Sequence, residues 1–213
     1  MTSESFLVVS IPALLAYLIG GLPFGYLFVR FSMGRDVRTM GSGNIGATNV
    51  HRTAGRKAGL IVLLLDIFKG WLAVWLAAVF SHGNAVAVAL AIAGVMLGHC
   101  YPLFLNFKGG KAVACFVGAF LYVAPLTLLA TAVIFFLAVA GSKFISLGSI
   151  AGAAVFPFLF WAIERPALPI LLASIFAGLL VIYRHKGNIE RLRAGTENTF
   201  SLKGGSIGNR PST

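Results

Sequence analysis

The sequence predicts an all-α integral membrane protein with about seven transmembrane helices, on three observations. The chain has 213 residues, 58% of them hydrophobic and only 11% charged, whereas soluble domains are about 25% charged. Several apolar runs reach or approach the roughly 20 residues that a helix needs to cross a bilayer. The lysines and arginines gather in loops on one side, as expected for cytoplasmic loops. The net charge of +11 therefore indicates orientation in a membrane, and we expect no nucleic-acid partner.

The first two spans are expected over residues 6–29 and 58–80. The five residues before the first span contain an acidic residue and no basic one, whereas a signal peptide begins with basic residues. This charge pattern predicts that the N-terminus lies outside. The second span contains Asp66 and Lys69, three positions apart and so on one helical face. Ionisable groups at that depth are normally paired. We therefore favour a mutual ion pair that fixes helix packing over a role in supporting an anion site.

The remaining spans follow from the apolar runs and from sidedness. Residues 85–104 form the third span, and the run over 112–140 contains Pro125. Proline breaks a helix, and splitting the run there into two short or partly re-entrant spans keeps the basic segments on one side. The last spans cover 146–162 and 166–183. The count is then seven, with the N-terminus outside and the C-terminus cytoplasmic. One domain is expected over residues 1–201, followed by a disordered tail over 202–213.

Cysteine and histidine usage gives no sign of a metal or a cofactor. Cys100 and Cys115 have no ligand spacing and are interpreted as reduced, small apolar residues. The four histidines are scattered among few carboxylates, which argues against a metal site.

The polar segment at 41–52, between the first two spans, is the first candidate site. Its glycines allow successive N–H groups to converge, and its hydroxyls and arginine add donors, a combination suited to a phosphate. Close helix packing is the alternative for its glycines, but it leaves the polar residues unexplained. The segment also matches the G-x-G-x-x-G dinucleotide pattern, which we reject because no strand precedes it. The candidate anion-binding residues here are Ser42, Gly43, Asn44, Gly46, Thr48, Asn49 and Arg52.

A second polar segment, 98–111, ends in Lys108-Gly109-Gly110-Lys111 before an apolar helix. It lacks the full phosphate-loop motif. Two glycines are nevertheless expected to expose their N–H groups near a helix start, where the dipole favours an anion, with a lysine on either side. Ser146 and Ser149, at the start of the sixth span, are expected to face the same site.

A third cluster lies in the basic segment from Arg184, where a short interfacial helix is expected. His185 and Asn188 stand three positions apart, and a histidine beside two anion-binding loops is a candidate hydrogen-bonding or acid–base group.

Three ordered motifs resemble the PlsY family of bacterial membrane glycerol-3-phosphate acyltransferases. They are Gly-Ser-Gly-Asn-Ile-Gly-Ala-Thr-Asn-Val-x-Arg at 41–52, Gly-His-x-x-Pro-x-Phe-x-x-Phe-Lys-Gly-Gly-Lys at 98–111, and Arg-His-x-x-Asn-Ile-x-Arg-Leu-x-x-Gly-x-Glu at 184–197. The resemblance implies a seven-helix fold in the bacterial inner membrane with a cytoplasmic active site. It also implies acyl transfer from acyl phosphate to the 1-hydroxyl of sn-glycerol 3-phosphate, giving lysophosphatidate and phosphate, without a cofactor or an obligate protein partner.

The resemblance assigns roles to single residues. Ser42 and Arg52 match critical residues of the first motif, and His185 with Asn188 matches an active-site pair. Gly109, Gly110 and Lys111 correspond to a phosphate-binding turn, and Glu197 to an acid with a largely structural role. We hypothesise that Ser42 binds substrate without forming an acyl-enzyme, because acyl phosphate already carries a good leaving group, and that a substrate phosphate oxygen helps to remove the proton.

Two alternatives remain. A His185–Glu190 pair approximates the His-x-x-x-x-Asp motif of soluble-type acyltransferases, with Glu190 five positions after His185. A transporter of organic phosphates would use the same basic loops. However, no inverted repeat is visible, and the polar groups lie on one side of the spans instead of at their middle.

Overall fold

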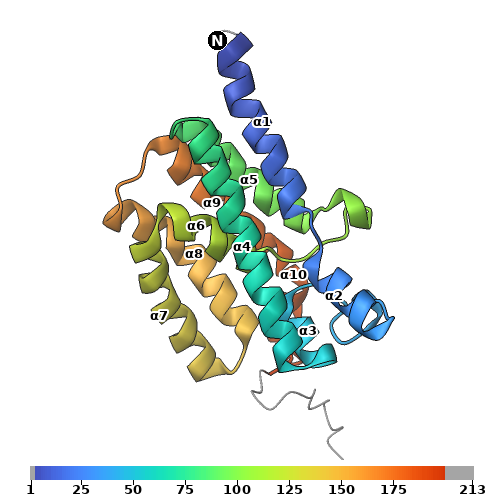
Figure 1. Cartoon of the computed structure of the whole chain (residues 1–213). Coiled ribbons are helices and arrows are strands. Elements are labelled where there is room, and N and C mark those ends of the chain that lie inside the picture. Colours follow the sequence, from blue (N-terminus) through green and yellow to red (C-terminus); the bar gives the residue numbers. More distant parts are fainter. Residues whose placement is uncertain (1–2, 200–213) are drawn as a thin grey trace, which may run out of the picture.

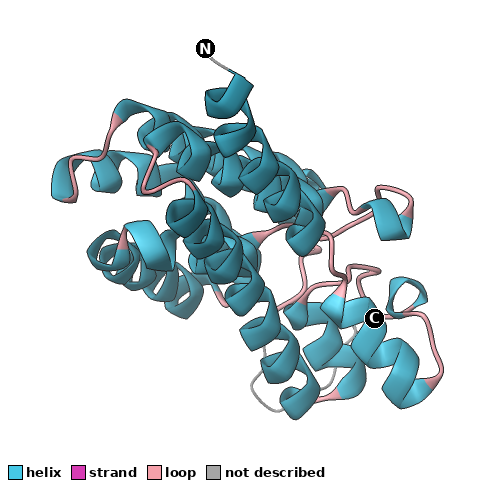
Figure 2. Cartoon of the chain, turned by 45° about the horizontal axis from the view of Figure 1, so that its top comes forward, coloured by secondary structure: helices cyan, strands magenta, loops and turns pink. Residues whose placement is uncertain are grey.

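The computed structural model describes residues 3–199, with side chains from residue 7 onward. Figure 2 shows that this part of the chain consists of helices and connecting loops. The long helices are α1 (Ser3–Gly20), α4 (Arg56–Phe80), α5 (Ala85–Cys100), α7 (Pro125–Ser142), α8 (Ile145–Ile163) and α9 (Leu168–Arg184). The shorter ones are α2 (Phe24–Met33), α3 (Ala47–Ala54), α6 (Val113–Val123) and α10 (Lys186–Arg193), with 3-10 turns η1 (Val37–Thr39) and η2 (Leu103–Leu105).

The membrane-spanning character of the chain agrees with these lengths. Within residues 3–199, five spans are long and apolar enough to cross a membrane, or six if α9 and α10, which meet at 52°, count as one. The expected break at Pro125 is present, because α6 ends at Val123 and α7 begins at Pro125. The chain is thus an all-helical, multi-pass membrane protein, while the count of seven and the orientation of the termini stay predictions. The predicted tail over 202–213 lies outside the described residues.

The first expected span, 6–29, is confirmed as a candidate span over Leu7–Met33, but it is not one continuous helix. Its chain breaks between α1 and α2 at Gly21-Leu22-Pro23, because proline has no N–H to continue the helical ladder. The side chain of Lys69 donates to the carbonyl of Leu22 at 2.7 Å. A cation from α4 therefore binds the broken backbone at a carbonyl that also accepts the Phe24 N–H at 3.1 Å.

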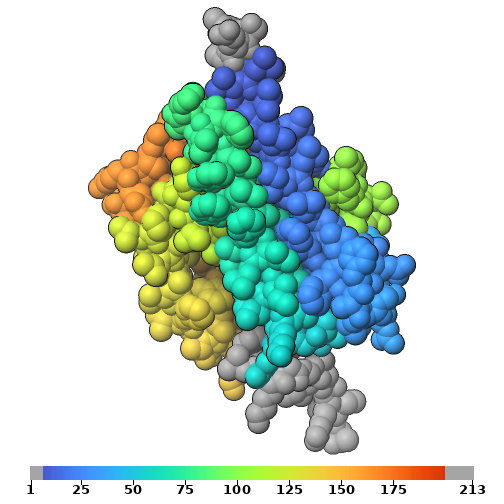
Figure 3. Space-filling model, in the orientation of Figure 1, coloured from blue at the N-terminus to red at the C-terminus, as the bar shows by residue number. Residues whose placement is uncertain are grey.

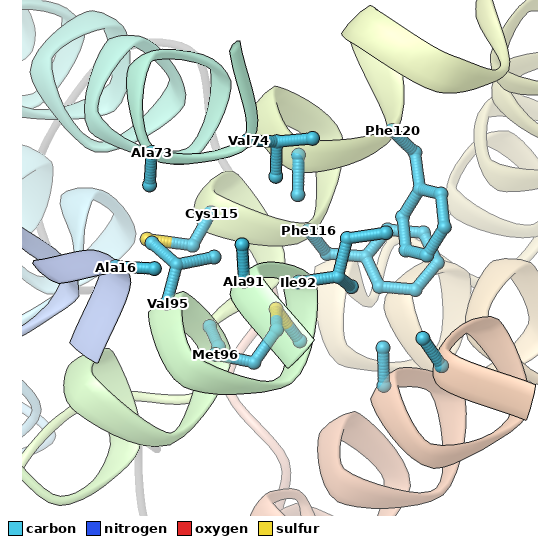
Figure 4. Close-up of a cluster of buried hydrophobic side chains, with 14 of the residues drawn as sticks. Ala16, Ala73, Val74, Ala91, Ile92, Val95, Met96, Cys115, Phe116 and Phe120 are labelled. Atoms are coloured by element: carbon cyan, nitrogen blue, oxygen red, sulfur yellow. The ribbon is translucent and has the colours of Figure 1, made fainter. Parts of the chain in front are cut away.

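The core lies where α1, α4, α5 and α6 meet. Close approach there depends on glycine: a Cβ on Gly98 of α5 would lie 2.1 Å from the Tyr17 carbonyl of α1, and one on Gly118 of α6 would lie 1.9 Å from the Ile67 carbonyl of α4. Small residues allow such contact between membrane helices. Figure 4 shows the side chains that fill the remaining space, among them Ala16, Ala73, Val74, Ala91, Ile92, Val95, Met96, Cys115, Phe116 and Phe120.

The short helices α2, α3 and α10 gather at the end of the bundle away from the N-terminus (Figure 1). A smaller apolar cluster unites this end, with Val29, Val37, Val50, Val62 and Leu105 buried in it. Leu105 belongs to the segment around η2, which stands out in bright green at the edge of the molecule in Figure 3. Leu103 and Phe104 of this segment are exposed. The three polar segments singled out in the sequence therefore meet at one end.

Candidate active site

The first polar segment is built around the side chain of Asn49. Its amide nitrogen donates to the carbonyls of Val37 (3.3 Å), Met40 (3.0 Å) and Asn44 (2.8 Å), and its oxygen accepts the Ser42 N–H at 2.8 Å. The side chain is buried, and its polar atoms are engaged with backbone. The expectation that Asn49 binds substrate directly is therefore replaced by a role in shaping the loop.

The second half of this segment forms a helix, whereas a loop was expected from the sequence. Helix α3 begins at Ala47, after Gly46, and its residues Thr48 and Arg52 are four apart and so on one face. Burial lowers the pKa of Arg52, and the charge of Arg191 lowers it further, whereas the carboxylate of Glu197 opposes the shift. Arg52 thus points into the same region as residues nearly 150 positions later in the chain.

The glycine turn of the second segment is held by the backbone of α5. Gly109 N–H donates to the Cys100 carbonyl at 3.1 Å, and Gly110 N–H donates to the His99 carbonyl at 3.0 Å. The expectation that these two N–H groups face an anion is therefore wrong, because both already have acceptors. Lys111 follows the turn, and its ammonium is the group that the turn delivers to the site.

The third segment turns back on itself after α10. Gly195 has a positive φ of 68°. Thr196 N–H donates to the Arg191 carbonyl at 2.9 Å, and Gly195 N–H to the Leu192 carbonyl at 3.3 Å. This is a Schellman helix end, which favours glycine at that position. The reversal brings the carboxylate of Glu197 back against α10.

Glu197 is the centre of the site's hydrogen-bond network. Its carboxylate accepts from Ser146 Oγ (3.0 Å), Asn188 Nδ2 (2.7 Å) and Arg191 Nε (2.7 Å). The oxygen of Asn188 in turn accepts from Lys111 Nζ. One continuous network therefore joins α8, α10 and the turn before α6. Asn188 connects Glu197 to Lys111 within it.

The charge of this region is strongly positive around one carboxylate. Burial and, to a smaller extent, neighbouring guanidinium groups together lower the pKa of Lys111 to about 8. Glu197 opposes this shift. Partly buried cations that outnumber their counter-charge create a site suited to an anion. The arginines that act on Lys111 are Arg191, Arg52 and Arg184.

His185 lies at the junction of α9 and α10 and is buried. Its Nδ1 is 2.7 Å from the carbonyl oxygen of Val181. A carbonyl only accepts, so Nδ1 carries the proton and Nε2 is the free acceptor. Burial lowers the pKa of His185 to about 4, against a smaller opposing effect of the Val181 hydrogen bond. The ring is therefore neutral at pH 7.

The other predicted site residues lie in exposed, buried or turn positions. The hydroxyl of Ser42 is on an exposed residue and makes no hydrogen bond within the described chain, and Lys108 is also exposed. Ser149 is buried and bonds its own helix at the Ile145 carbonyl. The side chain of Asn44 accepts the Gly46 N–H at 2.8 Å and so forms a turn directly before α3. Gly43 has a positive φ of 71°, which makes it a turn residue.

The sequence did not identify Arg184 and Arg191 as site residues, and it did not distinguish Ser146 from Ser149. Arg191 binds Glu197, and Arg184 donates to the carbonyls of Gly110 and Gly109, both at 3.0 Å. Ser146 contacts Glu197, whereas Ser149 does not. The spacing Asn188–Arg191 on one helical face, and the place of Arg184 directly before His185, were the available signals.

The ion pair between Asp66 and Lys69 is confirmed, at 2.7 Å with both side chains buried. His99 Nδ1 lies 3.8 Å from Asp66 and 3.4 Å from Cys115 Sγ. Ligand atoms of Asp66, His99 and Cys115 lie within 4.8 Å of one another, a spacing that could hold a metal ion. Lys69 already places a cation against the carboxylate, so we interpret the group as a charge-balanced link between α4, α5 and α6.

Comparison with known proteins gives concordant matches. A family model described as glycerol-3-phosphate acyltransferase matches residues 10–195. A glycerol-3-phosphate acyltransferase from Geotalea daltonii is 44% identical over 94% of this chain and 99% of its own length. The corresponding protein of Geobacter sulfurreducens is 46% identical over 87% of this chain and 94% of its own.

Two solved structures are also similar. Both are of PlsY, an integral membrane glycerol 3-phosphate acyltransferase. The glycerol 3-phosphate form has a TM-score of 0.85 at 34% identity, covering 92% of this chain and 96% of that one. The lysophosphatidic acid form has a TM-score of 0.82 at 32% identity with the same coverage.

Proposed function

The chain belongs to the PlsY family of glycerol-3-phosphate acyltransferases, and from this premise we propose its full reaction. It transfers a fatty acyl group from acyl phosphate to the 1-hydroxyl of sn-glycerol 3-phosphate. The products are 1-acylglycerol 3-phosphate and inorganic phosphate, and the step is the first of phospholipid synthesis. No cofactor takes part.

One observation carries the proposal: Arg52 and Lys111 come from different segments and share the field of a single carboxylate, Glu197. An acyl-phosphate donor and a glycerol phosphate acceptor bring two phosphates, so the reaction needs more than one cation. A thioester donor brings no phosphate at its reacting carbonyl. The excess of cations therefore supports the acyl phosphate.

In the proposed mechanism, Arg52 and Lys111 hold the two phosphates so that the acceptor hydroxyl lies against the acyl carbonyl. The hydroxyl oxygen attacks the carbonyl carbon, a C–O ester bond forms, and the bond from that carbon to the phosphate oxygen breaks. The same cations stabilise the negative charge that develops on the carbonyl oxygen. Ser42 contributes a hydrogen bond to substrate.

The proton of the attacking hydroxyl goes to a phosphate oxygen. His185, with its pKa at about 4, is a weaker base than a phosphate, whose second pKa is about 6. His185 Nε2 accordingly accepts a hydrogen bond from the hydroxyl and orients it. Trapping of a stable acyl group on Ser42 would contradict this mechanism.

The site is proposed to face the cytoplasm of a bacterial inner membrane. The helix ends that carry Arg52, Lys111 and His185 also carry most of the basic residues, including Arg56, Lys57, Lys143 and Lys186. Short basic loops remain on the cytoplasmic side of a membrane. Glycerol 3-phosphate would therefore enter from water and the acyl donor from the bilayer.

The test uses purified protein in lipid, labelled glycerol 3-phosphate, and palmitoyl phosphate, acyl-CoA or acyl-carrier protein in separate reactions. Transfer from palmitoyl phosphate alone is expected. Arg52→Ala should reduce it by about 100-fold or more, whereas Arg56→Ala, an exposed neighbour on α4, should leave it unchanged. Transfer only from thioesters would overturn the donor. Uptake of glycerol 3-phosphate into vesicles without acyl product would favour a transporter.

A further inference from the structure

Arg184 holds the glycine turn from the side opposite to α5. Its Nε donates to the carbonyl of Gly110 and its Nη2 to that of Gly109, both at 3.0 Å. A guanidinium is a planar fork whose donors are fixed relative to one another, so it can hold two adjacent carbonyls in one geometry. A lysine ammonium, a single point charge on a flexible stem, has no such fork.

The guanidinium is itself held in place. It lies over the ring of Tyr101 with 5.0 Å between its central carbon and the ring centroid, a cation–π contact. The carbonyl of Tyr101 accepts the hydroxyl of Tyr17 on α1 at 2.8 Å. Arg184 therefore connects α9, the loop after α5 and, through Tyr101, the first helix.

The turn has no freedom left once Arg184 is bound. The N–H groups of Gly109 and Gly110 donate to the carbonyls of Cys100 and His99, and their own carbonyls accept from Arg184. A Cβ on Gly109 would lie 2.2 Å from the His99 carbonyl oxygen, and one on Gly110 would lie 2.2 Å from His99 Nε2. The glycines are thus required for packing between α5 and Arg184.

Lys111 leaves this turn directly, before Ala112 at a φ of 58°. Its ammonium reaches Asn188, which lies four positions after Arg184 in the chain, just past the α9–α10 junction. The backbone from which Lys111 projects and the side chain that it meets are therefore both fixed by one short stretch of chain.

We infer that Arg184 is a positioning residue, which fixes the Gly109–Gly110 turn and thereby sets where the Lys111 ammonium meets the phosphate of glycerol 3-phosphate. This inference rests on the proposed function for its substrate. Arg184 acts through the turn, since both of its hydrogen bonds within the described residues go to backbone carbonyls and not to a side chain that binds substrate.

The first test is Arg184→Lys, which keeps the charge and removes the fork. The KM for glycerol 3-phosphate should rise by about tenfold or more, with kcat and the KM for the acyl donor within about threefold. Arg193→Lys is the matched control, an exposed arginine on α10, and should behave as wild type. An unchanged KM for glycerol 3-phosphate, or an equal rise for both substrates, would overturn the inference.

The second test does not depend on activity. Hydrogen–deuterium exchange of the segment 101–112 in full-length protein should be faster in Arg184→Lys than in wild type, because the turn loses one of its two anchors. Tyr101→Leu, which removes the ring beneath the guanidinium, should change exchange in the same direction by less, and it serves if Arg184→Lys does not fold. Unchanged exchange in both variants would overturn the inference. Wild-type protein without acyl transfer would instead refute the proposed function, and exchange would still decide the role of Arg184.

Discussion

The two halves of the candidate site are held in opposite ways. In the first polar segment, the side chain of Asn49 forms hydrogen bonds with four backbone groups, all of them between Val37 and Asn44. In the second, the turn before Lys111 is held by Arg184, 74 positions away along the chain from Gly110. One half is therefore a self-contained local structure, and the other acquires its geometry only from tertiary packing. Substitutions should separate the two.

The largest effect is expected from the local half, with Asn49→Asp. The aspartate has the same size and still accepts the Ser42 N–H. Its second carboxylate oxygen, however, faces the three carbonyls to which the Asn49 amide donates in the wild type. A buried unsatisfied polar group costs about 1–3 kcal/mol, so we expect loss of transfer by about 100-fold or more with both substrates. Initial rates at saturating substrate measure it. Thr53→Ala, whose hydroxyl bonds only its own helix, is the control, and near-normal rates for Asn49→Asp would refute the local account.

Glu197→Gln should have the next largest effect, on the assembled half. It removes the negative charge shared by Arg52, Lys111 and Arg191 while keeping the length of the side chain. We expect about a 10- to 100-fold fall in kcat/KM. Since Glu197 raises the pKa of Lys111, the alkaline limb of the pH profile should also move to lower pH. An unmoved limb would show that the carboxylate does not act on Lys111.

The pH dependence of the wild type gives a more moderate effect. The pKa of Lys111 is lowered to about 8, so its ammonium is charged below that pH and neutral above it. The kcat/KM for glycerol 3-phosphate should then fall by about tenfold per pH unit above about 8. Lys111→Arg should carry activity to higher pH, because a guanidinium stays protonated. A flat wild-type profile well above pH 8 would argue against a charged Lys111 in substrate binding.

The smallest effect is expected from Glu190→Gln. Glu190 is exposed on α10, whereas Glu197 is buried in the network. Rates should stay within about twofold of wild type. A loss comparable to that of His185→Ala would restore a His185–Glu190 acid–base pair and would place the chemistry on α10 alone.

The same comparison explains what could be predicted from sequence. Apolar run lengths and Pro125 indicated most helices correctly, because a spanning helix depends on local composition. Asp66 and Lys69 could be paired because they are three positions apart. The α1–α2 break was missed because Gly21 and Pro23 are common in membrane helices, and α3 was missed because Gly46-Ala47-Thr48-Asn49 has weak helix propensity.

Non-local partners could not be predicted in the same way. The sequence indicated that Gly109 and Gly110 mark a turn, but not that α5 carbonyls would take their N–H groups. It indicated a basic segment from Arg184, but not which arginine binds backbone and which binds Glu197. These pairings depend on how α5, α9 and α10 pack, and no spacing within one segment encodes that.

The position of Glu197 in the chain has a consequence for biogenesis. At about 5–20 residues per second, synthesis of the stretch between Arg52 and Glu197 takes roughly 7–30 s. During that interval the first loop is already complete, and Arg52 and, once it has been synthesised, Lys111 lack the carboxylate that balances them. The network around Glu197 can therefore form only after α10 and the turn that follows it have been synthesised.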